Sequence, residues 1–209
     1  MPKLDDKQSY RTSLEHHTLS DSNTTNTMPI RALLTFAAML GGIVIVANYT
    51  VQFRIGDTPL TFGALTYPFS FLLLDILSEK YPKKETIKVV GLGIMIAFLP
   101  SYFAATPQIA CASILAFCIS QPLDVVLFYT FKRFFPKLWW LRNGCSTIIA
   151  QFFDTMVFFN LAFFGTQALA TSMNMALADY LLKALVGIAN TPIFYLFAIR
   201  IKNVWKNIT

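Results

Sequence analysis

The chain has 209 residues, of which 55% are hydrophobic and only 13% are charged, and it contains 20 phenylalanines. A soluble globular domain usually carries about 25% charged residues, so this composition excludes an ordinary soluble domain. The formal net charge is +6, but 15 of the 17 Lys and Arg residues lie in the N-terminal part, in two connections and after the last apolar segment. That distribution is typical of membrane orientation rather than of a nucleic-acid-binding surface, so no nucleic acid partner is expected.

The first 29 residues differ in composition from the rest of the chain. Residues 1–29 are rich in Ser, Thr, Asn and Asp and lack the apolar core of a signal peptide. A segment that cannot bury apolar surface does not offset the entropy lost on folding. We therefore expect a disordered cytoplasmic tail over residues 1–29, followed by one transmembrane domain over residues 30–209.

Six apolar segments follow this tail. Because a helix rises 1.5 Å per residue, about 20 apolar residues cross a hydrocarbon core of about 30 Å. The sequence therefore predicts an all-α membrane protein with six transmembrane helices. Since the basic residues flank the same ends of these segments, both termini are expected in the cytoplasm, and residues 165–179 at the outer surface. The segments cover residues 33–51, 59–77, 87–103, 109–131, 145–164 and 180–199.

Two absences and one pattern bear on cofactors and partners. The sequence has no glycine-rich phosphate loop, so the chain is not expected to hydrolyse ATP itself. Its three cysteines lack metal-ligand spacing, and no metal or cofactor is expected. The first segment carries two small-residue pairs, Ala37 with Gly41 and Ala38 with Gly42, which let helices approach closely in lipid. These pairs fit internal packing, or a docking face for a second copy or a partner subunit.

Ionisable side chains occur inside the apolar segments, where they are rare and mark functional sites. Asp75 and Glu79 lie four residues apart near the end of the second segment. Glu79 is close enough to the interface to be solvated, or paired with Lys80 or Lys83. Asp75 lies one turn deeper and has no such explanation.

A short pattern occurs twice, as ISQPLDVVLF from residue 119 and as IAQFFDTMVF from residue 149. Gln121 and Asp124 share one helix face, as do Gln151 and Asp154, because a helix turns once per 3.6 residues. Phe128 and Phe158, each four residues after its Asp, extend the same two faces. In an antiparallel hairpin, Gln121 should stand level with Asp154 and Gln151 level with Asp124. The repeat therefore predicts a pair of Gln–Asp contacts across one helical hairpin.

Such a cluster suits three kinds of role. Gln and Asp side chains can hold helices together in lipid, each contact contributing ~0.6 to 2 kcal/mol. Two buried carboxyls can also form a proton relay. A carboxylate and an amide, flanked by Phe rings, match a flat heterocycle with adjacent N–H donors. Prolines at 100, 122 and 192 add the broken helices that alternating-access transporters use near their sites.

Four ordered stretches resemble one known family. They are YPFSFLLLDILSEKY over residues 67–81, QPLDVVLF from residue 121, WLRNGCST over residues 140–147 and AQFFDTMVFF from residue 150. These are similar to the motifs of the queuosine precursor transporters, also called the vitamin uptake transporter family. Pro82 and Gly144 stand where the family more often has Gly and Asn.

The resemblance implies a six-helix, multi-pass protein of the bacterial inner membrane. It implies import of 7-deazaguanine bases or queuine, which are purine-like small molecules, for salvage into the tRNA nucleoside queuosine. Eight of the matching polar positions, all except Ser146 and Thr147, form the expected substrate site together with Phe128 and Phe158. The motif positions are Asp75, Glu79, Gln121, Asp124, Arg142, Asn143, Ser146, Thr147, Gln151 and Asp154.

Three mechanisms remain open at this point. The leading one is a secondary importer, with proton coupling possible, in which Asp124 and Asp154 bind the base or a proton. In this mechanism Asp75 and Glu79 form a contact or gate on the cytoplasmic side. The second is a substrate-binding subunit that needs an ATPase partner. The third, an intramembrane aspartyl protease, is disfavoured because Asp124 and Asp154 should lie at different depths, so we expect no enzyme.

Overall fold

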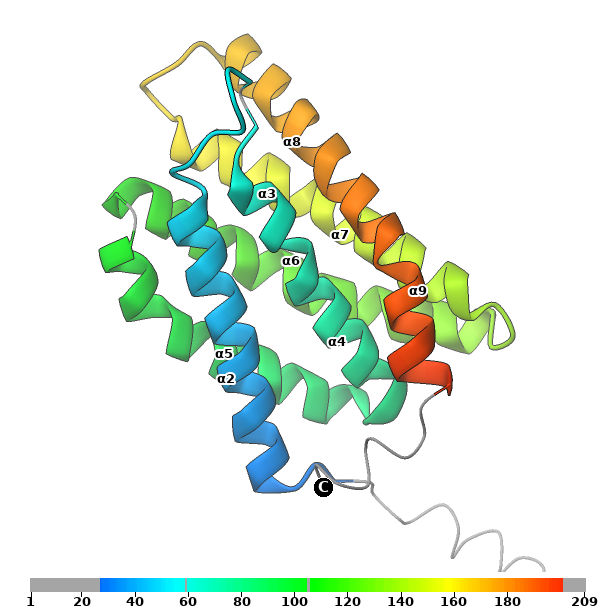
Figure 1. Ribbon diagram of the computed structural model, residues 1–209. Helices are drawn as coiled ribbons and strands as arrows, with labels where there is room; N and C mark the ends of the chain where they lie inside the picture. Colours follow the sequence, from blue (N-terminus) through cyan, green and yellow to red (C-terminus); the bar gives the residue numbers. More distant parts are fainter. Residues whose placement is uncertain (1–26, 59, 105, 201–209) are drawn as a thin grey trace, which may run out of the picture.

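The computed structural model describes residues 27–58, 60–104 and 106–200 (Figure 1). The tail expected over residues 1–29 lies almost wholly outside these ranges. Regular structure in the described residues is helical, apart from one isolated bridge between Arg54 and Thr61. The helices are α2 (Ile30–Thr50), α3 (Phe62–Thr66), α4 (Pro68–Lys80), α5 (Lys83–Ala104), α6 (Pro107–Phe134), α7 (Trp139–Ala162), α8 (Leu169–Ala189), α9 (Thr191–Phe194) and the π-helix η1 (Tyr195–Arg200).

Five described stretches are long and apolar enough to cross a membrane. They are α2, α5, α6, α7 and the continuous run from α8 to η1. The remaining predicted crossing is occupied by α3 and α4 together, neither of which is long enough alone. The chain is therefore an all-α membrane protein, as the sequence predicted.

Two of the six segments differ from the single helices that were expected. The second is divided at Tyr67, because Pro68 opens α4 and has no N–H to continue the hydrogen bonds of α3. The last is interrupted at Asn190, just before Pro192. Pro100 and Pro122 lie inside the continuous helices α5 and α6.

The expectation that residues 165–179 form a surface connection is wrong from Leu169 onward. The helix α8 begins at Leu169, eleven residues before the predicted start at Tyr180. The cause is composition: Leu, Ala and Met have high helix propensity, and the polar residues among them do not stop the helix.

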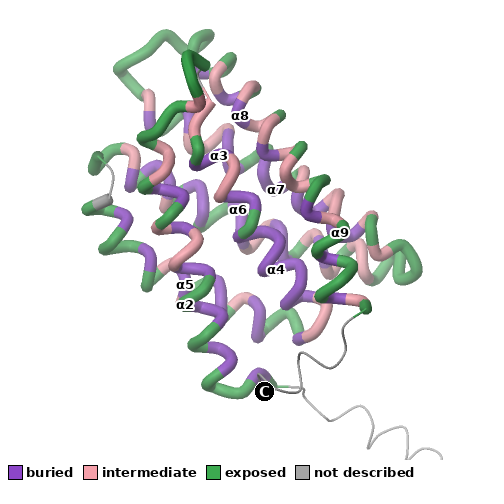
Figure 2. Tube along the Cα trace, viewed as in Figure 1, coloured by how far each residue is buried: buried purple, intermediate pink, exposed green. Residues whose placement is uncertain are grey.

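The short helix α4 is the centre of the molecule. It contacts every other described helix, and its nine consecutive residues from Ser70 to Ser78 are all buried. Figure 2 shows this continuous burial in the middle of the bundle. A helix that is covered on all sides has no face left for lipid, so its polar side chains must find partners on the surrounding helices.

The small residues of α2 have divided roles. Ala37 and Gly41 are buried, and a Cβ on Gly41 would come within 2.8 Å of the Ile96 side chain on α5. This pair therefore serves internal packing between α2 and α5. Ala38 is exposed, and a Cβ on Gly42 would meet nothing within 4 Å.

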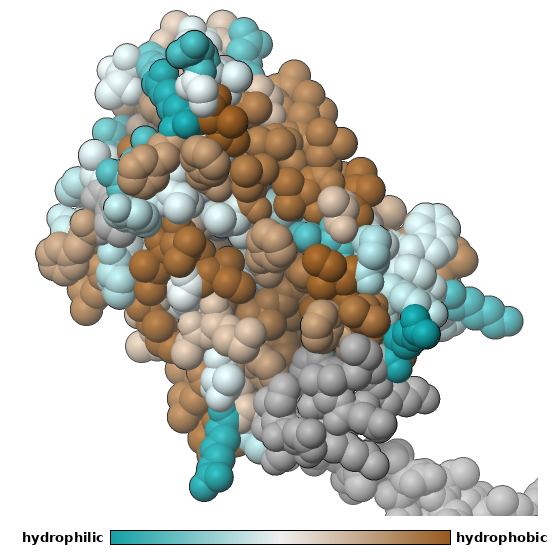
Figure 3. Space-filling view, in the orientation of Figure 1, coloured by the Kyte–Doolittle hydropathy of each residue, from teal (hydrophilic) through white to brown (hydrophobic). Residues whose placement is uncertain are grey.

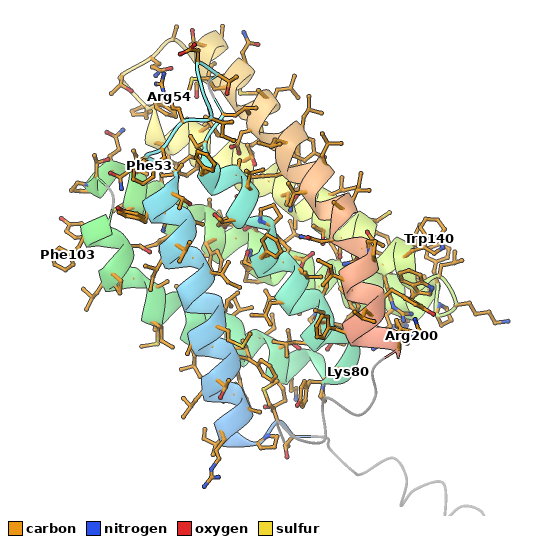
Figure 4. All side chains as sticks on the ribbon, viewed as in Figure 1. Phe53, Arg54, Lys80, Phe103, Trp140 and Arg200 are labelled. Carbon is orange, nitrogen blue, oxygen red and sulfur yellow. The ribbon has the colours of Figure 1, made fainter. Side chains whose placement is uncertain are left out.

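The bundle has two polar ends separated by an apolar surface. Figure 3 shows hydrophobic residues over most of the visible face between hydrophilic ends. Figure 4 places Phe53 and Arg54 at one end, and Lys80, Trp140 and Arg200 at the other. The start of α2 and the end of η1 lie at the second of these ends (Figure 1), which we call the basic end. We call the opposite end the Arg54 end.

Candidate functional site

Asp75 is held in the interior by three side chains of α7. Its carboxylate accepts hydrogen bonds from Asn143 Nδ2 at 2.5 Å, Thr147 Oγ1 at 2.8 Å and Ser146 Oγ at 3.4 Å. These donors share one face of α7 because they lie three and four residues apart. Asp75 is fully buried, so neutral donors alone compensate its removal from water.

Asp124 on α6 lies next to this cluster. Its carboxyl adjoins that of Asp75 and lies near Ser146. Neither of its oxygens has a hydrogen-bond partner of good geometry among the described residues, although the side chain is fully buried. A buried carboxyl without such partners, next to a second carboxyl, forms a place where a proton can be held between the two.

Asp154 on α7 is compensated in a different way. It accepts hydrogen bonds from Tyr67 Oη at 2.8 Å and Ser120 Oγ at 2.9 Å. Its other oxygen lies 3.5 Å from Lys183 Nζ on α8. Lys183 also pairs with Asp179 at 2.8 Å and lies 4.9 Å from the centre of the Tyr67 ring. This is a buried ion-pair network that joins Tyr67, which lies between α3 and α4, to the helices α6, α7 and α8.

The structure shows other hydrogen-bond partners for the two Gln–Asp contacts that the sequence predicts, and the register of the hairpin agrees to within one residue. Ser120, beside Gln121, stands level with Asp154 and bonds to it. Gln121 instead donates to Ser70 of α4 at 3.1 Å. The amide of Gln151 has no hydrogen-bond partner in the described part of the chain. Asp154 is instead bound by the hydroxyls of Tyr67 and Ser120 and by the ammonium of Lys183.

A third cluster lies at the basic end. Glu79 pairs with Arg142 at 3.0 Å and with Lys132 at 3.5 Å. Arg142 also donates to the carbonyl of Pro136, and Lys132 donates to the carbonyls of Ser78 and Glu79. The second segment and the α6–α7 hairpin are thereby fastened together at this end.

The three clusters form one polar column along α3 and α4. Tyr67, Asp75 and Glu79 contact Asp154, Asn143 and Arg142 in turn. Glu79 lies twelve residues after Tyr67, which corresponds to about 18 Å at 1.5 Å per residue. A continuous series of polar groups through an apolar bundle is typical of a path for a polar solute.

A cavity of about 260 Å³ lies at the Arg54 end of this column. Asp154, Lys183 and Tyr67 line its buried part, and Arg54 and Gln52 lie at its exposed part. Three phenylalanines complete the lining from α7 and its end, namely Phe158, Phe159 and Phe163. The cavity therefore combines a carboxylate, an ammonium and flat apolar walls.

The ten predicted site residues divide among these clusters. Asp154 and Phe158 line the cavity. Gln121, Asp124, Gln151, Asp75 and Asn143 lie in the buried interior, and Glu79 and Arg142 lie at the basic end. Phe128 packs instead against Phe194, with ring centres 6.2 Å apart, in an apolar cluster with Leu72 and Ile76.

Sequence reasoning did not single out Lys183 as a site residue. A signal was present, because Asp179 and Lys183 are four residues apart in an otherwise apolar helix and an i, i+4 pair shares one face. The expectation that residues 165–179 lie at the outer surface separates Asp179 from the last helix and hides this pair. Tyr67 was likewise recognised only as part of a motif.

Comparisons with known proteins agree with this architecture. Residues 61–197 match the family described as "putative vitamin uptake transporter". The chain is 33% identical to a "probable queuosine precursor transporter" of Bacillus subtilis, over 65% of this chain and 70% of that protein. It is 26% identical to the "queuosine precursor transporter" of Escherichia coli, over 70% of this chain and 76% of that protein.

A third relative, the "probable queuosine precursor transporter" of Haemophilus influenzae, is 27% identical over 61% of this chain and 63% of its own length. No solved structure matches the chain. The family match covers every element of the polar column and most of the cavity. This multi-pass bacterial membrane protein therefore belongs to the vitamin uptake transporter family, which its sequence motifs had indicated.

Proposed function

We propose that this chain is an inner-membrane importer of queuosine precursors, either 7-deazaguanine bases or queuine, for salvage into tRNA. The names of three relatives support this substrate class. The observation that carries the proposal is the cavity with Asp154 at its base, continued by the polar column along α4.

The chemistry of the cavity fits a flat base. A guanine-like ring presents a ring N–H beside an exocyclic amine, and one carboxylate accepts both. Asp154 is the candidate acceptor, and binding there would compete with its pair to Lys183. Phe158 and its aromatic neighbours offer faces for ring stacking. A volume of about 260 Å³ lies near the lower end of ligand pockets and suits one small ring system.

The arrangement of the ends fits an outward-facing importer. By the positive-inside rule the basic end, with the start of α2 and the end of η1, faces the cytoplasm, and the cavity opens to the outside. On the cytoplasmic side, Glu79 and Arg142 form a gate, with Asp75 and Asn143 closing the path behind it. Opening inward requires these contacts to separate while the Arg54 end closes.

Energy coupling is assigned to the carboxyl pair of Asp75 and Asp124. The two groups adjoin each other in the buried interior. Two neighbouring carboxyls in such a place are not readily ionised at the same time, because their like charges repel. One proton taken up outside and released inside would make this a secondary, proton-coupled importer. Gln121 and Gln151, with unpaired amide atoms nearby, would contact the base as it passes.

The alternative is a substrate-binding subunit that depends on an ATPase partner. The exposed Ala38 and the half-buried Gly42 on α2 would then form the docking face for that partner, or for a second copy. The two mechanisms differ in what they require for uptake. Purified chain in sealed vesicles with an imposed pH gradient would import the base in the first case and not in the second.

The proposed function is tested by uptake of labelled queuine and its smaller 7-deazaguanine precursors. The host should make none of these bases, lack its own importer and express this chain or its Asp124→Asn and Asp154→Asn variants. We expect import by the wild type, and loss of import in both variants at equal membrane abundance. Normal transport by both variants would remove the two carboxyls from the mechanism, and no import by the wild type would contradict the function.

A further inference from the structure

A polar side chain of α2 lies on the cavity wall without a complete set of partners. Asn48 lines the cavity and is only 4% exposed. Its Oδ1 accepts a hydrogen bond of 2.6 Å from Ser113 Oγ on α6. Its Nδ2 has no partner among the residues that the structure describes. Asn48 also lies outside residues 61–197, the range that matches the family.

A buried amide donor without a partner is costly in an apolar environment. If the role of Asn48 were only to tie α2 to α6, an acceptor for Ser113 would suffice, and an asparagine would add an unsatisfied N–H. Ser113 instead fixes the amide, because it engages Oδ1 and leaves Nδ2 as the free donor. The arrangement is that of a recognition group oriented before its ligand arrives.

The chemistry of a guanine-like base requires such a donor. Beside its N–H and amine donors, the ring carries a carbonyl oxygen that only accepts hydrogen bonds. Asp154, which suits the donors, cannot donate to this oxygen while it is ionised.

The other donors deep in the cavity are already engaged. Tyr67 Oη donates to Asp154, and Lys183 pairs with Asp154 and Asp179. Thr61 Oγ1 also lines the cavity without a partner among the described residues, but Thr61 is bridged to Arg54 at the exposed part of the cavity. Asn48 Nδ2 is the unpartnered donor that belongs to a buried residue away from that exposed part, and it is therefore available to a carbonyl.

We propose that Asn48 is a specificity-determining residue that donates a hydrogen bond from Nδ2 to the ring carbonyl of the transported base. This inference rests on the proposed function and deepens it. Asp154 on α7 and Asn48 on α2 then recognise adjacent donor and acceptor groups of the same ring edge. A base with an amine in place of the carbonyl would set N–H against N–H and be rejected.

The test compares two labelled bases, a 7-deazaguanine that the wild type imports and its analogue with an amino group in place of the ring carbonyl. The wild type is expected to prefer the carbonyl base by about 10- to 100-fold in uptake efficiency, the range for one unsatisfied buried group. Asn48→Leu should raise the apparent KM for the carbonyl base by a similar factor and reduce the preference to the part that comes from the ring N–H, which the amino analogue also lacks and which Asp154 recognises. Asn48→Ala, which adds no bulk, should do the same.

Two control variants separate recognition from structure. Ser113→Ala removes the same link between α2 and α6 but leaves the donor in place, so it should keep most of the preference. Asn160→Leu alters an exposed asparagine whose Nδ2 donates to the Met156 carbonyl and lies 4.0 Å from Met173 Sδ. It should change the uptake of neither base. Membrane abundance of each variant is measured in parallel.

The outcomes discriminate between the two claims. If the wild type imports both bases equally, or if Asn48→Ala retains the full preference, the role of Asn48 is overturned while the importer stands. If Ser113→Ala and Asn48→Ala lose the preference equally, the amide acts as a helix tie and the inference is also overturned. If the wild type imports no 7-deazaguanine base, the proposed function is wrong, and so is this inference, which rests on it.

Discussion

At the scale of single residues, the three buried carboxyls of the column differ in what compensates them. Asp75 has neutral donors, Asp154 has a cation and two hydroxyls, and Asp124 has no hydrogen bond of good geometry among the described residues. An ionised group taken out of water requires such compensation. The same substitution should therefore have different consequences at the three positions.

Asp75→Asn should destabilise the protein and abolish uptake. An asparagine presents donors to Asn143 and Thr147, which are themselves donors to the carboxylate. Mismatched buried donors cost about 1–3 kcal/mol, so the thermal unfolding temperature of the detergent-purified chain should fall. Asp57→Asn, at an exposed loop position, is the matched control. An unchanged unfolding temperature for Asp75→Asn would contradict the hydrogen-bond network described around it.

Lys183→Met should be more severe, because it leaves Asp154 and Asp179 without their cation. Removing one partner of a buried ion pair typically costs about 3–5 kcal/mol. Adding Asp154→Asn should restore part of the lost thermal stability without restoring uptake, since the proposed acceptor is then absent. Lys88→Met, at an exposed lysine paired with Glu85, should be close to neutral. Equal unfolding temperatures for Lys183→Met and Lys88→Met would argue against the buried network.

At the scale of elements, close approach of α2 and α3 shapes the cavity wall. Gly63 lines the cavity, and a Cβ there would come within 2.9 Å of the Ala47 carbonyl oxygen and 3.0 Å of the Val51 Cα. Both are backbone atoms, which cannot move aside as a flexible side chain does. The two helices can pack at this distance because position 63 has no side chain.

Gly63→Ala should therefore separate α2 from α3 and destabilise the protein by about 1–3 kcal/mol, the usual range for overpacking. Gly91→Ala is the internal control, because a Cβ there meets nothing within 4 Å on an exposed face of α5. Alanine at that position should be neutral or stabilising by up to about 1 kcal/mol. Thermal unfolding of both purified variants measures the difference, and equal shifts would contradict the close approach at Gly63.

Some features of these elements could be predicted from the sequence, and others could not. Hydrophobic segments and the hairpin register were predictable, because both follow from helical repeat and chain length. The partners of Gln121 and Asp154 were not, since Ser70 and Lys183 belong to helices whose placement the hairpin pattern does not encode. The break at Tyr67 was missed because hydropathy is continuous across Pro68, and the site roles of the motif residues stay predictions.

At the scale of the whole molecule, the two ends differ in charge and in closure. The Arg54 end holds the cavity, and the basic end is fastened by Glu79 with Arg142 and Lys132. An importer that works by alternating access is open at one end and closed at the other in each of its two main conformations. The orientation of the ends in the membrane is consequently the first global property to measure.

Asp57→Cys and Lys83→Cys report this orientation in a chain whose three native cysteines, at 111, 118 and 145, are replaced by serine. In intact cells, an impermeant thiol reagent should label the cysteine at position 57, beside the Arg54 end. The cysteine at position 83 should be labelled only after the membrane is opened, because the basic end faces the cytoplasm. The reverse pattern would invert the proposed direction of transport.

The central position of α4 also has a consequence for how the protein is made. Its 13 residues are about 20 Å long, less than the hydrocarbon thickness of about 30 Å, and they carry Asp75 near the middle. The side chains that satisfy Asp75 lie on α7, which the ribosome synthesises some seventy residues later. We expect α4 to leave the insertion machinery slowly, shielded from lipid until the α6–α7 hairpin arrives to enclose it.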